Sequence, residues 1–500
     1  MAPVLPTTPN APSAPSAPAD LNPPLYRQLA ERLAGAIHSG ALRPGARLAS
    51  VRDMAREQAV SVATVLQAYR WLEDAQLLQV RPRSGYFVAS AAPRALAEPG
   101  TSAPPADALA VDVSSLSERV LQLAADPAVI SFGAACPQAE LFGQERIRRA
   151  LSQATLRHRA LLGQYPQVPG QEALRSAIAR RALAMGCTLD PREILVTNGC
   201  NEAVALCLQA VTRPGDTVVL ESPTSFGFLQ ILEALHLKAL EIPTHPRHGL
   251  SVDALALALQ TQPVRAVLAV PTLSNPLGAS LPLAERRRLA QLLATHQVPL
   301  IEDVIYNDLA ERDEHRRAVK SFDTEGWVML CGSFSKTVAP GLRVGWLEAG
   351  RHSTAVRRLK AAFSGGHTPV LELAMAELLN QSGYVTQLRK LRQAIAPRIA
   401  EARALVATHF PRGTKVTDPS GGIMLWLELP GGVDSLALFK ACLDEGICIA
   451  PGTMFSATDR FRHCIRLSVG SGWGDVQRQA LRRVGALAGQ WAATGLKQAA

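Results

Sequence analysis

The sequence predicts two folded domains: a small domain of three helices and a β-hairpin, and a large α/β domain whose sheet is mainly parallel. Three observations indicate this fold class. Short helical patterns followed by a strand–turn–strand pattern occupy residues 24–89. Beyond residue 112, strand-like apolar segments alternate with helical ones, as in α/β domains. The chain has 500 residues, which is too long for one ordinary hydrophobic core.

Composition divides the chain further. Alanine, proline, serine and threonine dominate the first residues and return before the large domain, which is typical of disordered tails and flexible linkers. Prolines at every third position near the N-terminus also fit a polyproline II helix. The expected division is a tail over 1–23, a small domain over 24–89, a linker over 90–111, a large domain over 112–490 and a tail over 491–500.

The overall composition indicates a cytoplasmic globular protein. Hydrophobic residues make up 47% of the chain, and no apolar run approaches the roughly 18 residues of a membrane span. The N-terminus lacks the basic start and apolar stretch of a secretory signal. The eight cysteines are scattered without a C-x-x-C pair, so we expect buried, reduced thiols and no metal site. The net charge of +10 permits a polyanionic partner.

The small domain has the element pattern of a winged helix-turn-helix. Leucine and isoleucine recur every four residues over 25–37, which predicts the first helix. Ser50 and Ser61 can cap a second and a third helix, and residues 77–88 predict a hairpin. In this fold the start of the third helix enters the major groove of DNA.

Charge and motifs in the small domain point to DNA. Nine arginines stand against five acidic residues in 24–89, and the two on the wing can contact phosphates. The motifs LASVRDMA, VSVATV and RPRSGYFV resemble the GntR-type winged helix in order and spacing. The DNA-binding residues expected from the wing and the resemblance are Arg52, Ser61, Thr64, Arg81, Arg83 and Gly85. Val62 replaces an arginine common in relatives, and a protein-contact role for this domain is the alternative.

Five apolar, strand-like segments of the large domain are candidates for its sheet. They occupy residues 194–197, 217–221, 266–270, 299–303 and 328–333. Small polar residues follow several of them. Ligands of open α/β sheets bind beyond the carboxyl ends of the strands, so these polar clusters are the candidate ligand site.

Three of the clusters have specific chemistry. Residues 198–203 form a glycine turn into a helix, where backbone N–H groups and the helix dipole can hold an anion; an ordinary strand–helix turn has the same pattern. Asn275 lies in an Asn-Pro turn after the third strand. Asp303 ends the fourth strand and Tyr306 follows one helical step later; a carboxylate there can also be a helix cap.

The fifth strand is followed by Ser333, Ser335, Lys336 and Arg343, which suit a phosphate with a carbonyl nearby. A single lysine is more often a solvated surface group. Among the eight lysines of the chain, Lys336 alone is flanked by two hydroxyls and an arginine.

In this order the clusters resemble the aminotransferase type of pyridoxal-phosphate fold, over about residues 112–490. The resemblance implies pyridoxal 5′-phosphate as the cofactor, with Lys336 forming its Schiff base and Asp303 keeping its pyridine nitrogen protonated. Asn275 and Tyr306 are expected to bond the ring oxygen, and Tyr306 joins Lys336 and Asp303 as the catalytic set. The residues expected around the phosphate are Gly199, Cys200, Asn201, Ser333, Ser335 and Arg343.

Three more positions follow from this resemblance. Tyr165 matches a tyrosine that reaches the phosphate of a partner subunit, which implies a homodimer. Arg466 matches an arginine that binds a substrate carboxylate through a bidentate pair. Ser225 stands where relatives carry an aromatic residue that stacks on the ring, and Phe226 is the candidate substitute.

The two domains in one chain resemble the MocR-type transcriptional regulators. The resemblance implies a regulator that binds operator DNA and whose large domain senses pyridoxal phosphate or its adduct with an amino compound. An active aminotransferase with an appended DNA-binding head is the alternative, because sensing and turnover need the same residues. A third interpretation is a DNA-binding protein with a cofactor-free scaffold, which the intact Lys336 and Asp303 disfavour.

Overall fold

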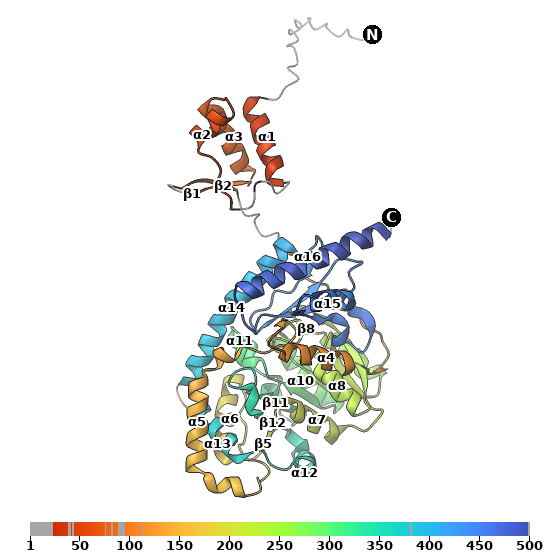
Figure 1. Ribbon diagram of the computed structural model, residues 1–500. Coiled ribbons are helices and arrows are strands. Elements are labelled where there is room, and N and C mark those ends of the chain that lie inside the picture. The colour runs from red at the N-terminus through yellow and green to blue at the C-terminus, as the bar shows by residue number, and fades with distance from the viewer. Residues whose placement is uncertain are drawn as a thin grey trace, which may run out of the picture. The chain divides into compact units, whose positions relative to one another are not determined.

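The computed structural model describes residues 24–38, 42, 45–75, 77–81, 84–88, 96–112, 114–380 and 383–498. The chain forms two compact units, Met1–Arg94 and Ala95–Ala500 (Figure 1). None of the helices in the described ranges is long and apolar enough to cross a bilayer.

The described residues of the small unit form the predicted three helices and hairpin. Their bounds are α1 (Leu25–His38), α2 (Val51–Glu57), α3 (Val62–Asp74), β1 (Leu78–Arg81) and β2 (Gly85–Val88), the strands being antiparallel. Ser50 and Ser61 cap α2 and α3 as expected, since each Oγ accepts a hydrogen bond from the backbone N–H three residues later. The winged helix-turn-helix predicted from the sequence is confirmed.

One buried face of α3 holds the small unit together. Val65, Ala68, Tyr69 and Leu72 are fully buried and pack with Leu29 and the hairpin. The Tyr69 hydroxyl donates a hydrogen bond of 2.9 Å to the carbonyl of Ala49, so the buried phenol is satisfied. The opposite face, which begins at the exposed Ser61, stays free of this core.

Among the described residues, nine strands form the main sheet of the large unit, in the order β3-β7-β6-β9-β10-β11-β12-β5 with β8 beside β7. The pairs from β7 to β11 along this order are parallel, and the outer pairs are antiparallel. The strands are β3 (Leu109–Ala110), β5 (Ile194–Thr197), β6 (Thr217–Ser222), β7 (Lys238–His245), β8 (Gly249–Leu250), β9 (Val264–Ala269), β10 (Leu300–Asp303), β11 (Val328–Ser333) and β12 (Gly345–Glu348).

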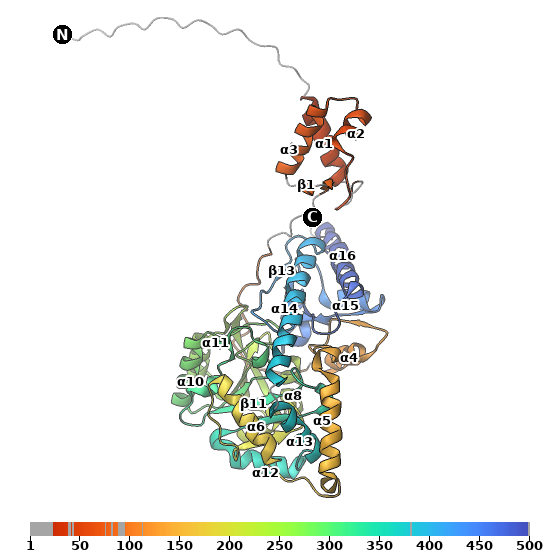
Figure 2. The same ribbon diagram turned by 90° about the vertical axis from the view of Figure 1, so that its left-hand side faces the viewer.

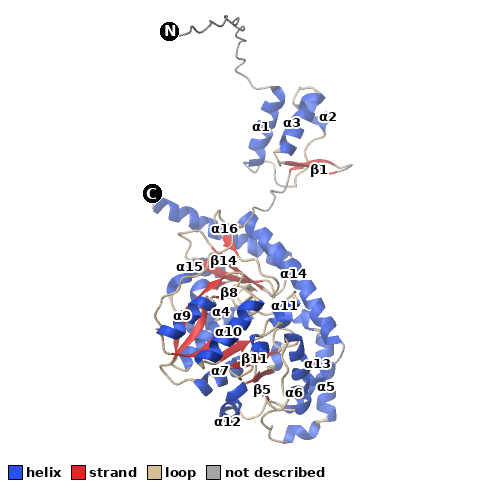
Figure 3. Ribbon diagram, turned by 180° about the vertical axis from the view of Figure 1, so that it is seen from behind, coloured by secondary structure: helices blue, strands red, loops and turns tan. Residues whose placement is uncertain are grey.

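Helices cover both faces of this sheet (Figure 3). Along β6, Val218 packs into the hydrophobic cluster that contains α7 and α8, whereas Val219 packs into the cluster with α9 and α10. This alternation explains why the central strands are continuous apolar runs. The helices of the large unit are α4 (Ser114–Ala125), α5 (Gln144–Arg157), α6 (Glu172–Ala182), α7 (Cys200–Val211), α8 (Phe226–Ala234), α9 (Val252–Thr261), α10 (Leu283–His296), α11 (Asp313–Arg316), α12 (Ser353–Phe363), α13 (Pro369–Asn380), α14 (Gly383–His409), α15 (Ser435–Leu443) and α16 (Asp475–Gln498).

A second sheet, here called the C-terminal sheet, is antiparallel and has the order β13-β14-β17-β16. The strands are β13 (Lys415–Val416), β14 (Met424–Glu428), β16 (Ala450–Pro451) and β17 (Cys464–Ser468); β4 (Ile130–Ser131) and β15 (Ile447–Cys448) pair separately. The long helices α14 and α16 pack together beside it (Figure 2).

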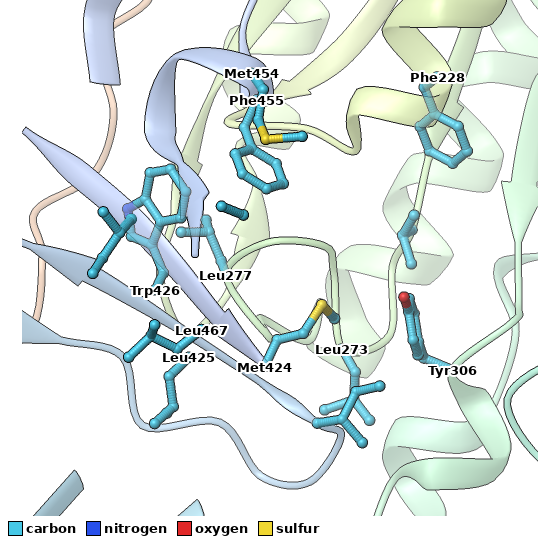
Figure 4. Packing of buried hydrophobic residues seen from close by; sticks show 14 of the residues in the cluster. Phe228, Leu273, Leu277, Tyr306, Met424, Leu425, Trp426, Met454, Phe455 and Leu467 are labelled. Atoms are coloured by element: carbon cyan, nitrogen blue, oxygen red, sulfur yellow. The ribbon is translucent and has the colours of Figure 1, made fainter. Parts of the chain in front are cut away.

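The two sheets meet through a continuous apolar core. The Trp426 ring on β14 lies perpendicular to that of Phe455, with 5.5 Å between ring centroids. In Figure 4, Met424 of the same strand faces Leu273, which lies in the segment after β9 of the main sheet. Tyr306 lies close by. The cluster therefore joins elements from both sheets around the region where the candidate site residues lie.

Two segments differ from the expected division. The stretch expected as a linker over 90–111 contains, at 96–110, residues bonded to the large unit: β3 pairs with β7, and Ser102 exchanges hydrogen bonds with Thr244. The composition of this stretch is typical of a loop, but its backbone pairs with β7, an element that is distant in the sequence. At the other end, α16 continues to Gln498, beyond the expected boundary at residue 490.

Candidate functional site

A cavity of about 350 Å³ lies at the carboxyl ends of β10 and β11 in the large unit. Its position is the one where ligands of α/β sheets bind. The predicted site residues that line it are Cys200, Asn201, Phe226, Asn275, Asp303, Tyr306, Ser333, Ser335, Lys336, Arg343 and Arg466. The structure thus brings together residues that are spread over more than half of the sequence.

Lys336 enters the cavity from the segment after β11. Its amine has no hydrogen bond or ion pair with any residue that the structure describes, and it is half-buried. Burial lowers the pKa of this amine, which increases the neutral, nucleophilic fraction. Lys360 offers a contrast, because it is fully buried but bonded to Glu202 at 2.9 Å. Lys336 is therefore available for a carbonyl ligand.

Asp303, the last residue of β10, lines the cavity. Its Oδ1 accepts hydrogen bonds from the backbone N–H of Ile305 at 2.9 Å and from the Cys200 thiol at 3.2 Å. Burial raises the pKa of Asp303 to about 6. A cationic N–H in the cavity would favour the ionised carboxylate.

The thiol bond to Asp303 was missed by sequence reasoning. Cys200, the first residue of α7, was expected near the phosphate, which its backbone and side chain could help to hold. Because burial raises the pKa of its thiol well above the usual value, the group stays protonated and can donate. No local pattern signals this contact, since the two residues are 103 positions apart.

The start of α7 forms an anion-binding corner. Its first backbone N–H groups have no partner within the helix and point along the helix dipole. Gly199, just before the helix, has φ +84°, and a Cβ there would lie 2.6 Å from Nη2 of Arg343. Arg343 donates from Nη2 to the carbonyl of Asn198 at 3.2 Å. Gly199 does not line the cavity; it leaves space for Arg343 beside the helix start.

Arg466 lies on β17 of the C-terminal sheet and is fully buried. Its Nη1 donates to Oδ1 of Asn275 at 3.1 Å and its Nη2 donates to the carbonyl of Gly133. Its Nε has no hydrogen-bond partner among the described residues. Burial lowers the pKa of Arg466 to about 10, and no acid pairs with it in the described structure. A buried guanidinium without a counter-ion suits an incoming carboxylate.

Ser225, Phe226 and Tyr306 complete the wall. Ser225 precedes α8 and its Oγ accepts a hydrogen bond from Nδ2 of Asn275 at 3.2 Å, a contact that sequence reasoning did not anticipate. The Phe226 ring lies edge-on to Phe455 with 5.9 Å between centroids. Tyr306 is buried, which raises the pKa of its phenol and keeps it a neutral donor.

Tyr165 stands apart from this cavity. It follows a short 3-10 helix at Arg159–Gly163, and its side chain is 92% exposed. An exposed tyrosine of this kind contributes nothing to its own subunit's cavity.

The predicted DNA-binding residues lie on the small unit. Arg52 on α2 and Ser61 at the start of α3 are exposed, and Thr64 is half-buried, with its backbone N–H bonded to the Ser61 Oγ. Arg81 is exposed with its guanidinium 4.4 Å from the centre of the Phe87 ring. Gly85 has φ +103°. Arg83 lies outside the described residues.

Arg47 is a further cation of the small unit that sequence reasoning did not single out. A Cβ at position 85 would lie 3.7 Å from its Nε, so Arg47 flanks the wing strand. Its backbone forms an isolated antiparallel bridge to Phe87. The segment between α1 and α2 thus adds a basic side chain beside the hairpin.

The side chains around the cavity fit pyridoxal phosphate. The unpaired amine of Lys336 suits its aldehyde, the Asp303 carboxylate suits a pyridinium N–H, and the start of α7 with Arg343 suits its phosphate. When bound, this cofactor supplies an electron sink. The class defined by fold and cavity is a pyridoxal-phosphate-dependent, aminotransferase-like domain carried in one chain with a winged helix.

Comparison with known families agrees with this class. The family described as "Aminotransferase class I and II" matches residues 139–477, and the family described as "Bacterial regulatory proteins, gntR family" matches residues 25–88. These two matches correspond to the large and the small unit.

Two curated relatives span nearly the whole chain. The uncharacterized HTH-type transcriptional regulator YdcR of Escherichia coli K12 is 38% identical over 463 residues, covering 92% of this chain and 98% of the relative. YjiR, a regulator of the same description and organism, is 35% identical over 460 residues with the same coverage. The probable rhizopine catabolism regulatory protein MocR of Rhizobium meliloti is 27% identical and covers 86% of this chain and 87% of its own.

Solved structures match the large unit. The α-aminoadipate aminotransferase LysN of Thermus thermophilus, complexed with N-(5'-phosphopyridoxyl)-L-leucine, has a TM-score of 0.69 and 25% identity, covering 77% of this chain and 96% of that one. Kynurenine aminotransferase of Pyrococcus horikoshii has a TM-score of 0.70 and 25% identity, and the match covers 75% of this chain and 95% of that one. The chain belongs to the MocR-type family of HTH-type transcriptional regulators, which join a GntR-type DNA-binding domain to a class I and II aminotransferase domain.

Proposed function

We propose that this protein regulates transcription by coupling the ligand state of its large unit to operator binding by its small unit. The ligand is pyridoxal phosphate together with an amino compound. The observation that carries the proposal is that two groups share one cavity in a chain with a winged helix. One is the amine of Lys336, which has no partner among the described residues, and the other is the buried guanidinium of Arg466, which has no acidic partner there. Such a regulator would act in the cytoplasm, where its DNA is.

Each site residue then has a role. Lys336 holds the cofactor carbonyl and Asp303 holds the pyridinium, while the first N–H groups of α7 and Arg343 hold the phosphate. Tyr306 donates to the ring oxygen, with Asn275 beside it. Around these, Gly199, Cys200, Asn201, Ser333 and Ser335 shape the phosphate corner, and Phe226 packs against the ring.

The charges of the cavity indicate the chemical class of the amino compound. Among the described lining residues, only Asp303, Lys336, Arg343 and Arg466 are charged. The cofactor engages the first three, which leaves Arg466 for the effector. One acid group of the effector would pair with Arg466. A second acid group would find no further cation in the cavity lining, and a second amine would find no free carboxylate there. The effector is therefore an amino monoacid with a neutral remainder.

The rest of the lining agrees with a neutral remainder, because it is mostly apolar and its amide residue, Gln230, is uncharged. The residues that would face it are Leu121, Ala134, Ala135, Cys136 and Phe228. Leu121, on α4, is 42% exposed although it is a large apolar residue. Covering it with an apolar ligand would be favourable, by about 25 cal/mol for each Å² removed from water.

A homodimer is part of the proposal. Tyr165 is exposed and extends from the same region as Leu156 and Leu162, which are 78% and 60% exposed. Large apolar side chains gathered in this way are typical of protein–protein contacts. A second copy of the chain would cover them and would place Tyr165 at the partner's phosphate corner.

The test of effector class is an absorbance titration of the holoprotein. Leucine or phenylalanine should change the cofactor spectrum at lower concentration than glutamate or putrescine. γ-Aminobutyrate separates an α-amino from an ω-amino preference within the same class. Arg466→Met should weaken the response to the preferred compound at least about tenfold, because a buried guanidinium–carboxylate pair is lost. A tighter response to glutamate or putrescine would contradict the class.

Regulation and catalysis are distinguished by a DNA titration. Operator DNA is titrated into apoprotein, holoprotein and effector-loaded holoprotein, with turnover of the amino compound followed in parallel. Different affinities in these states support regulation. Equal affinities together with multiple turnovers would establish the alternative, an active aminotransferase with a DNA-binding head. This alternative stands because Lys336 and Asp303 are both present in the cavity.

A further inference from the structure

Residues 96–110, here called the strap, are the first described residues of the large unit, which begins at Ala95. Leu96 packs against the main hydrophobic cluster of the large unit and Pro99 is buried. The strap is therefore the part of the large unit from which the DNA-binding unit departs.

One part of the strap is bonded to the main sheet. The backbone N–H of Ser102 donates to the carbonyl of Thr244 at 3.2 Å, and the N–H of Thr244 donates back to the Ser102 Oγ at 2.9 Å. Farther along, Leu109 pairs with Ala239 in antiparallel register. All of these contacts are to β7.

Another part is bonded to the C-terminal sheet. The backbone N–H of Val416, in the edge strand β13, donates to the carbonyl of Ala97 at 2.9 Å. Glu98 forms an ion pair with Arg247, two residues beyond β7, and Arg247 Nη2 lies 3.7 Å from Oδ2 of Asp418, two residues beyond β13. The Glu98 carboxylate thus belongs to a chain of charges that links the strap to both sheets.

A cavity of about 310 Å³ lies beneath the strap. Strap residues 99–103 form one wall, Pro223, Thr244 and Leu277 come from the main-sheet side, and Trp426 and Cys464 come from the C-terminal sheet. The strap therefore lines this cavity together with residues from both sheets.

The ligand site crosses the boundary between the two sheets. Lys336 follows β11 of the main sheet, whereas Arg466 is in β17 of the C-terminal sheet. In the present structure the Arg466 guanidinium donates a hydrogen bond of 3.1 Å to the uncharged amide of Asn275, and this bond joins the two sides. An effector held by its amine side at Lys336 and by its acid at Arg466 would add a charged contact across that boundary.

We propose that the strap senses the relative position of the two sheets and transmits the effector state of the cavity to the DNA-binding unit. The proposal rests on the proposed function, since it needs an effector that spans Lys336 and Arg466. Bridging by the effector shifts the C-terminal sheet against the main sheet. This shift changes the geometry of the Ala97 and Ser102 contacts and thereby the point from which the small unit departs.

The experiment uses full-length holoprotein with Glu98→Gln and Ser102→Ala combined, and leucine as the probe effector. Glu98→Gln removes the ion pair with Arg247, and Ser102→Ala removes the acceptor for the Thr244 N–H. The control is Glu445→Gln, which removes an ion pair of 2.6 Å with Arg483 away from the strap. Operator affinity is measured with and without leucine, and the cofactor spectrum confirms that the cavity still responds.

In wild type and in the control, leucine should change operator affinity at least about fivefold, the lower end of common couplings. In the strap variant the change should fall below about twofold while the spectral response stays within about twofold. Hydrogen exchange of peptide 96–110 should depend on leucine in wild type. A strap variant that keeps the full leucine effect overturns the strap proposal and leaves the proposed function standing. No leucine effect on DNA in wild type, despite a spectral response, overturns both.

Discussion

The thiol of Cys200 donates a hydrogen bond of 3.2 Å to Oδ1 of Asp303, between the start of α7 and the end of β10. This contact ties the anion-binding corner to the carboxylate proposed to hold the pyridinium. It also gives Cys200 a side-chain role in addition to that of its backbone N–H.

Removing this donor should weaken cofactor binding. Cys200→Ala deprives the ionised Asp303 of a hydrogen bond, so the pKa of Asp303 should rise further above about 6. The pyridinium of the cofactor requires the ionised form of Asp303. As the pH is lowered, the affinity for the cofactor should therefore begin to fall at a higher pH in the variant than in wild type. We expect up to about tenfold weaker binding near pH 7, because a hydrogen bond to a charged group contributes about 1.5 kcal/mol or more.

The measurement is an absorbance titration with pyridoxal phosphate from mildly acidic to mildly alkaline pH. Cys200→Ser is the matched variant, because its hydroxyl preserves a donor at the same position, and it should behave as wild type. Identical pH profiles for wild type and Cys200→Ala would show that the thiol does not influence Asp303.

Lys336 should be the residue that carries the cofactor. Borohydride reduction of the holoprotein followed by peptide mapping should give a pyridoxyl label on Lys336, because its amine is unpaired and burial lowers its pKa. Lys360 provides an internal control, since it is buried but held by Glu202. Lys336→Ala should lose the label and the yellow colour. A label on Lys360, or on any other lysine, would refute the assignment.

The small unit should depend on its exposed arginines for DNA affinity. Arg52→Ala and Arg81→Ala should each weaken operator binding and lower the log–log salt slope by roughly 0.9 if each side chain neutralises one phosphate. Arg83→Ala is predicted from the sequence to act in the same way. Binding is measured at several salt concentrations, with cofactor uptake as a check that the large unit is intact.

Arg56→Ala is the control for this series. Arg56 lies on α2 like Arg52 and is exposed, but it is paired with Asp53 at 3.1 Å. Its removal should change the slope much less. If affinity and slope survive loss of Arg52, Arg81 and Arg83 together, the winged helix is not the DNA-binding element.

Glu221 on β6 should make stability depend on pH. It is buried, accepts a hydrogen bond of 2.9 Å from the Val270 N–H, and burial raises its pKa from 4.5 to about 8. Between these values the unfolded chain releases a proton that the folded chain retains. The contribution of Glu221 to the free energy of unfolding is thus full below pH 4.5, declines as the pH rises, and is lost above pH 8. The total decline across this range is on the order of 5 kcal/mol.

Glu221→Gln removes this titration and keeps an acceptor for Val270. Urea unfolding of the apoprotein should show equal stability of variant and wild type near pH 4.5 and a more stable variant near pH 8. Glu445→Gln, at an exposed ion pair, should show no such crossover. A variant that is less stable than wild type at both pH values would mean that Glu221 is ionised in the folded protein.

Local patterns in the sequence determined much of this molecule. The apolar period of four over 25–37 and the cap residues Ser50 and Ser61 were sufficient for the helices of the small unit, because capping and amphipathicity act within a few residues. The alternation of apolar, strand-like runs with helical segments indicated an α/β domain with a mainly parallel sheet. Polar residues after those runs indicated the cavity, because parallel strands end at one edge.

Contacts between distant residues were decided only by the tertiary structure. The Cys200–Asp303 bond, the Ser225–Asn275 bond and the unpaired Nε of Arg466 depend on how β10, α7, α8 and β17 converge. The strap has the composition of a linker, and only the open edge of β7 gives its backbone partners. Backbone hydrogen bonds at a sheet edge require a backbone segment at the right distance and depend little on the type of side chain. The composition of the strap therefore could not reveal its pairing with β7.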